Sequence, residues 1–137
     1  MTSAHRYWKA KESGKCVNCH SRKPEEGSLL CTKCHETRTK AINRVRYNTK
    51  LSVIFHYGGK CACCGETEIS FLSIDHINND GKKHRMSLGL KSAGTDFYQW
   101  LKKNNFPENL GLQVLCANCH LSKTVLGECI HSKKENQ

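Results

Sequence analysis

The residues best suited to catalysis are an acidic and a basic side chain that stand next to each other in the sequence. Asp75 and His76 end the apolar segment "ISFLSIDH", and a second histidine, His120, follows a Cys-x2-Cys pair further along. A carboxylate and an imidazole can hold a divalent cation, and imidazole can also act as a general base near neutral pH. Together the three residues predict metal-dependent hydrolysis of phosphodiester bonds.

Cysteines are the most frequent candidate metal ligands, and the chain has 10 of them. Most fall into Cys-x2-Cys pairs, and closed structural zinc sites take four thiolate or imidazole ligands. The first set of two pairs is Cys16, Cys19, Cys31 and Cys34, and the second is Cys61, Cys64, Cys116 and Cys119. Two structural zinc ions are therefore expected. Cys63 and Cys129 are left over, and we interpret them as packing or surface thiols.

Three of the pairs are followed by a histidine, which is also the attachment pattern of c-type haem. Covalent haem attachment generally takes place outside the cytoplasm. The first residues, "MTSAHRYWKAKESGK", contain no apolar segment typical of a signal peptide. The fourth pair is followed by Gly65 instead of histidine. A multihaem cytochrome is therefore a distant alternative, which a Soret absorption band would support.

The composition favours nucleic acid as the partner. The chain carries 22 Lys and Arg against 12 Asp and Glu, a formal net charge of +10. Each phosphate that such a protein neutralises releases condensed counterions, although a basic surface can also serve solubility alone. No stretch approaches the ~18 apolar residues of a membrane span. We expect a cytoplasmic protein with no membrane partner, and the choice between monomer and homodimer stays open.

The elements that must position these residues predict a small, zinc-stabilised α+β fold. Only 37% of the residues are hydrophobic, so the core must be thin. "ISFLSI" and "LQVL" have strand composition, "NNDGKKHR" that of a turn-rich loop, and "GTDFYQWLKKNN" and "ANCHLSKTVLGE" that of helices. Phe97, Trp100 and Leu101 share one helix face and are interpreted as core. The expected segments are a zinc knuckle or ribbon (1–35), a basic linker helix (36–57), a catalytic module (58–128) and a tail (129–137).

Several of these motifs together resemble the HNH, or ββα-metal, nuclease family, and in particular its phage-type members. They are the Cys61–Cys64 pair, "IDHI" (74–77), "LQVLC" (112–116) and "CANCHLSK" (116–123), over about residues 57–126. The resemblance implies a DNA endonuclease, acting in the host-cell cytoplasm if phage-encoded. His76 would be the general base. Asp75 and His120 would hold Mg²⁺ or Mn²⁺, or else Ni²⁺ or Zn²⁺.

One position departs from the family pattern. The central Asn of the family usually stands five residues before the cysteine that ends "LQVLC", where this chain has Gly111. Asn109, two residues earlier, is a candidate substitute; alternatively the chain has no central Asn. A different class remains open as well, a non-catalytic zinc-dependent nucleic-acid-binding protein. Such a binder has no need of the Asp75, His76 and His120 set.

Overall fold

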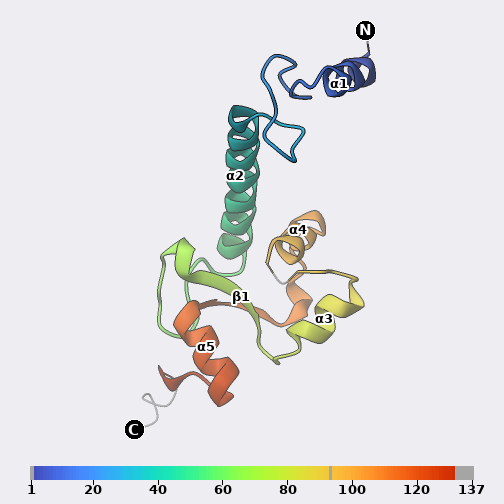
Figure 1. The fold of residues 1–137 in the computed structure, drawn as a ribbon. Coiled ribbons are helices and arrows are strands. Elements are labelled where there is room, and N and C mark those ends of the chain that lie inside the picture. Colours follow the sequence, from blue (N-terminus) through green and yellow to red (C-terminus); the bar gives the residue numbers. More distant parts are fainter. Residues whose placement is uncertain (1, 93, 132–137) are drawn as a thin grey trace. The chain divides into compact units, whose positions relative to one another are not determined.

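The computed structural model describes residues 2–92 and 94–131 (Figure 1). The protein is a small α+β chain that divides into two compact units, Met1–Val45 and Arg46–Gln137. The boundary falls inside the long helix α2, Thr32–His56. Because the boundary between the units lies within a single helix, the assignment of residues 36–57 as a separate linker stays a prediction. Of the predicted tail, residues 132–137 lie outside the described residues.

The unit Met1–Val45 is organised around thiols. It begins with helix α1, Ser3–Glu12, which the sequence analysis did not predict and which Thr2 caps by accepting a hydrogen bond from the backbone N–H of His5. Its buried cluster consists of Cys16, Cys31 and Cys34, with Cys19 and Leu30 packed against them. A core of this kind buries little hydrocarbon, and its four thiols could hold a metal ion that would add cohesion.

Helix α2 begins at Thr32, earlier than the predicted residue 36, and ends where the chain reaches Gly58 and Gly59. Gly59, with a positive φ of 71°, donates its backbone N–H to the carbonyl of Ile54 and closes the helix. Of the apolar residues that suggested a helix, Ile54 is buried and Val45 is exposed. The apolar face of α2 is therefore buried near the C-terminal end of the helix and exposed at Val45.

A two-stranded antiparallel sheet lies at the centre of the unit Arg46–Gln137. Strand β1, Leu72–His76, follows a short 3-10 helix, η1 (Ile69–Phe71), and pairs with strand β2, Leu112–Cys116. The register places Ile74 opposite Val114 and Asp75 opposite Gln113. Two strands alone are marginally stable in water, so the sheet needs a covering element. Helix α5, Ala117–Leu126, packs against both strands and provides it.

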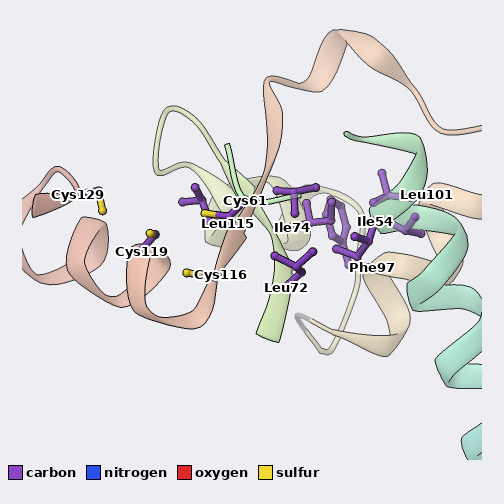
Figure 2. Packing of buried hydrophobic residues seen from close by; sticks show 12 residues of the cluster. Ile54, Cys61, Leu72, Ile74, Phe97, Leu101, Leu115, Cys116, Cys119 and Cys129 are labelled. Carbon is purple, nitrogen blue, oxygen red and sulfur yellow. The ribbon is translucent and has the colours of Figure 1, made fainter. Parts of the chain in front are cut away.

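The hydrophobic core of this unit contains buried cysteines together with aliphatic and aromatic side chains in one cluster (Figure 2). Helix α4, Thr95–Lys103, buries Phe97 and Leu101, which lie four residues apart on one face, as predicted. Trp100 packs against the same core while partly exposed. The other fully buried aliphatic side chains of the core are Val53, Ile54, Leu72 and Val114.

Two further segments differ from the prediction. Ile69–Phe71, the first half of the predicted strand "ISFLSI", form the 3-10 helix η1, and β1 begins only at Leu72. The segment interpreted as a turn-rich loop contains helix α3, Gly81–Ser87, with Asp80 at the N-cap position but without a capping hydrogen bond from its side chain. The Asn, Asp and Gly residues that suggested a loop lie around the start of this helix. A second short 3-10 helix, η2 (Glu108–Leu110), precedes β2.

Across the described residues, the structure contains no helix that is both long and apolar enough to cross a membrane.

Candidate functional site

The end of β1 and the first turns of α5 bring the three candidate catalytic residues to one cavity. Asp75 and His76 are the last two residues of β1 and are 5% and 8% exposed, and His120 lies on α5. All three line a cavity of about 370 Å³, together with Lys82 and Arg85. Residues far apart in the sequence thus meet because α5 packs against both strands of the sheet.

Asp75 is a buried carboxylate with its partners in place. Its Oδ2 accepts hydrogen bonds from Lys123 Nζ at 2.6 Å and from Gln113 Nε2 at 2.7 Å. Its Oδ1 lies 3.5 Å from Nε2 of His120. A buried charge is costly unless it is paired and hydrogen-bonded. Lys123 and Gln113 therefore hold one carboxylate oxygen, while the other is directed at His120.

His120 is oriented by the strand that α5 covers. Its Nδ1 lies 3.1 Å from Oγ of Ser73, and its Nε2 is the atom near Asp75. Two ligand atoms on one divalent cation, each at ~2.1 Å, are separated by roughly 3.0–3.4 Å. The observed 3.5 Å between Asp75 Oδ1 and His120 Nε2 is close to that range. The pair therefore fits a divalent metal as two of its ligands.

His76 is held by a second histidine, which comes from α3. Its Nε2 lies 2.9 Å from Nδ1 of His84, and its ring packs beside Phe97. Burial lowers the pKa of His76, and the charge of His84 lowers it further, against an opposing effect of Asp80 and Asp75. The neutral imidazole, which can accept a proton, is favoured as a result.

Gly81 provides the space beside the His76 ring. A Cβ atom at this position would lie 2.8 Å from Nδ1 of His76, which is too close. The start of α3 can therefore approach the ring only with glycine at this position. Sequence reasoning left His84 undecided between a loop side chain and a contributor to the site. The structure places it in contact with His76.

Lys123 is one of the site residues that sequence reasoning missed, together with Gln113 and Ser73. Its Nζ donates to the carbonyl oxygen of His76 at 2.7 Å as well as to Asp75, so it joins α5 to the end of β1. A signal was present in the sequence. Lys123 stands three residues after His120, a spacing that places both on one face of a helix.

Asn109, the candidate substitute for the family's central Asn, lies in η2. Unlike Asp75, His76 and His120, it is not among the described residues that line the cavity. Gly111, at the position of the family's Asn, adopts the left-handed conformation with φ 59°, and its carbonyl accepts a 2.9 Å hydrogen bond from the N–H of Ile77. This backbone bond ties the chain leaving β1 to the chain entering β2.

The eight paired cysteines converge in the two expected sets, and both can hold zinc. In each set the four sulfur atoms lie within 4.8 Å of one another. The Sγ–Sγ distance is 3.8 Å between Cys19 and Cys31, and 3.6 Å between Cys64 and Cys116. Tetrahedral zinc with bonds of ~2.3 Å separates its sulfur ligands by ~3.8 Å. The geometry of both sets therefore suits zinc.

Nearby donors favour the thiolate form of Cys19 in the first set and of Cys61 in the second, whereas the pKa of Cys34 and that of Cys119 are raised. A hydrogen bond from Ser21 and the backbones of Arg22 and Ser21 lower the pKa of Cys19 to about 5. Burial raises the pKa of Cys61, but hydrogen bonds from the backbones of neighbouring cysteines outweigh it and lower the pKa to about 6. Zinc binds the thiolate, so each set has at least one thiol already prepared for it.

No family model, curated protein or solved structure matches this chain. What the protein does must therefore be inferred from its own residues and from the geometry in which they meet.

Proposed function

We propose that this protein is a metal-dependent DNA endonuclease of the HNH, or ββα-metal, type. The observation that carries the proposal is the convergence of Asp75, His76 and His120 on one cavity. Two antiparallel strands and the helix that packs on them supply these residues, which is a ββα arrangement. A purely structural zinc protein needs no such set beside its cysteines.

The residues have distinct roles in this proposal. Asp75 and His120 hold a divalent cation, which supplies stabilisation of the negative charge that develops on the phosphate and the leaving oxygen. His76, kept neutral by burial, accepts the proton of the attacking water. His84 orients the imidazole of His76 through the contact between Nε2 and Nδ1. Lys123 and Gln113 hold Asp75 so that its other oxygen remains directed at His120.

The charge around the cavity suits a polyanionic substrate. Lys82 and Arg85 line the cavity and can contact phosphates on either side of the scissile bond. Along α2, Arg38, Lys40 and Arg44 are exposed. With a formal charge of +10, the chain gains affinity for DNA through counterion release.

Incubation with supercoiled plasmid tests the proposal directly. Cleavage is expected with Mg²⁺ or Mn²⁺ and not with EDTA. Asp75→Asn and His120→Ala are each expected to abolish it by weakening the metal site. His56→Ala is the matched control, because His56 is exposed and does not line the cavity. Cleavage by Asp75→Asn at the wild-type rate would show that this cavity is not the active site.

The same experiment reports how many strands one chain cuts. Each chain carries a single set of Asp75, His76 and His120, which can position one water against one phosphate at a time. Open-circular DNA is therefore expected to accumulate before linear DNA when protein is limiting. Direct conversion to linear DNA, with a second-order dependence on protein, would instead indicate an obligate homodimer.

A second candidate is a zinc-dependent nucleic-acid-binding protein without catalysis. The net charge and the exposed basic residues of α2 favour binding whether or not hydrolysis follows. This alternative predicts salt-sensitive DNA binding but no cleavage with any of Mg²⁺, Mn²⁺, Ni²⁺ or Zn²⁺.

A further inference from the structure

Two cysteines that belong to neither zinc set lie beside the second one. The Sγ atoms of Cys63, Cys119 and Cys129 and a ring nitrogen of His131 are within 4.8 Å of one another. Cys119 is also one of the four cysteines of the second zinc set. One thiol therefore belongs to two groups of four metal ligands at once.

We propose that the unit Arg46–Gln137 binds two zinc ions in a binuclear site that shares the Cys119 thiolate. Two four-coordinate ions need eight bonds, and seven residues provide them because one sulfur bonds to both ions. One ion takes Cys61, Cys64, Cys116 and Cys119, and the other takes Cys63, Cys119, Cys129 and His131. This site is structural and does not depend on the proposed nuclease activity.

The distances around His131 match those of a zinc site. Its Nδ1 lies 3.4 Å from Sγ of Cys119 and 3.4 Å from Sγ of Cys129. Tetrahedral zinc with bonds of ~2.3 Å to sulfur and ~2.0 Å to nitrogen separates the two atoms by ~3.5 Å. Nδ1 is therefore the atom of His131 that binds the second ion.

The chain returns to Cys119 through a reversal after α5. Gly127 ends this helix in the left-handed conformation, with φ 81°. Ser122, on α5, then accepts a 3.2 Å hydrogen bond from the backbone N–H of Ile130. This contact folds the segment that carries Cys129 and His131 back onto α5. Figure 2 shows Cys119 and Cys129 together, on the opposite side of the sheet residues from Leu101.

Burial and access suit a metal that enters from one side. Cys119 is fully buried and Cys129 is 8% exposed, whereas His131 is exposed. Cys63, Cys129 and His131 line a cavity of about 400 Å³ through which an ion can reach the sulfur atoms. Six thiolates would repel one another, and two Zn²⁺ ions offset four of their six charges.

Native mass spectrometry of the zinc-saturated full chain tests the stoichiometry. With Asp75→Asn in every protein compared, which removes the proposed catalytic metal site, three zinc ions per chain are expected, one in the Cys16 set and two in the binuclear site. The double variant Cys129→Ser/His131→Gln is expected to bind two. Its circular dichroism should stay native, because the Cys61 set remains complete. His5→Gln, an exposed histidine outside the clusters, is the control and should bind three. Two ions in the Asp75→Asn parent, or three after the double substitution is added to it, would overturn the proposal.

Substitution with ¹¹³Cd tests the bridge itself. Two of the three cadmium resonances are expected to show mutual coupling through the Cys119 sulfur, and one of these two should have the shift of a three-sulfur, one-nitrogen site. The double variant should lose that resonance, and its partner should lose the splitting. Three uncoupled resonances, or a Cys63–Cys129 disulfide in the metal-loaded protein, would exclude a shared thiolate.

Discussion

Each unit of this protein contains a set of four paired cysteines, but the two sets are supported differently. In the unit Met1–Val45 the buried cluster is made of the thiols themselves, with Leu30 beside them. In the unit Arg46–Gln137 the cysteines are one part of a larger core that includes Phe97 and Leu101. The first unit is therefore expected to exist only with its metal, whereas the second retains hydrophobic cohesion without it.

The two sets also differ in the number of residues between the cysteines that they bring together. Cys19 and Cys31 are 12 residues apart, whereas Cys64 and Cys116 are 52 residues apart. The long interval carries β1, α3 and α4, and with them Asp75, His76 and His84. A compact knuckle leaves room for little beyond a binding surface. The wider closure can hold a cavity lined by side chains from several elements.

Removal of zinc should give the largest difference between the units. Structural zinc contributes roughly 10–16 kcal/mol in small zinc modules. After chelation, peptides from Met1–Val45 should lose all protection from amide hydrogen exchange, while β1, β2 and α4 keep part of theirs. Hydrogen exchange with mass spectrometry measures this, and added zinc should restore both units. Equal loss of protection in the two units would mean that both depend on metal to the same degree.

His76→Ala tests whether the chemistry belongs to the second unit alone. Loss of a general base typically lowers the rate ~10²–10⁴-fold. Single-turnover cleavage should fall by this factor, while the dissociation constant for DNA changes little. Lys40 is exposed on α2, and Lys40→Gln should do the reverse: it should weaken DNA binding slightly without slowing cleavage of bound DNA. A wild-type cleavage rate for His76→Ala would remove this residue from the proposed mechanism.

Leucine substitutions compare the two cores. Leu101 is fully buried, so Leu101→Ala should cost about 2–5 kcal/mol of unfolding free energy for the second unit. Leu121→Ala is the matched control, because Leu121 is 64% exposed on α5. Leu30→Ala, at the partly buried leucine of the first cluster, should cost less than Leu101→Ala. Chemical denaturation of the zinc-loaded protein measures all three, and a similar cost for Leu30 and Leu101 would contradict the comparison.

The smallest expected effect concerns DNA binding by α2. Arg44 is exposed, and its proposed contact is with phosphate. Arg44→Gln should weaken binding about equally for all DNA sequences and lower the slope of log affinity against log salt by about one. Fluorescence anisotropy over a salt series measures this slope. Glu36→Gln, also exposed on α2, is the control and should not lower it.

Local signals predicted much of the fold. The spacing of Phe97 and Leu101 identified the buried face of α4, and the composition of "ISFLSI" indicated a strand, although β1 begins only at Leu72 and continues to His76. Such signals succeed because helix and strand periodicity are properties of neighbouring residues. The prediction failed at α3, because Asn, Asp and Gly residues can begin a helix as readily as they form a loop.

Sequence by itself determined the pairing of the eight cysteines, because Cys-x2-Cys spacing leaves two thiols on one turn of chain. Only the tertiary structure brought Lys123 to Asp75, His84 to His76, and Cys63, Cys129 and His131 to Cys119. These contacts depend on how α5 packs against the sheet and on where the chain reverses at Gly127. Residue spacing describes contacts within one element, whereas a site shared by several elements depends on their packing.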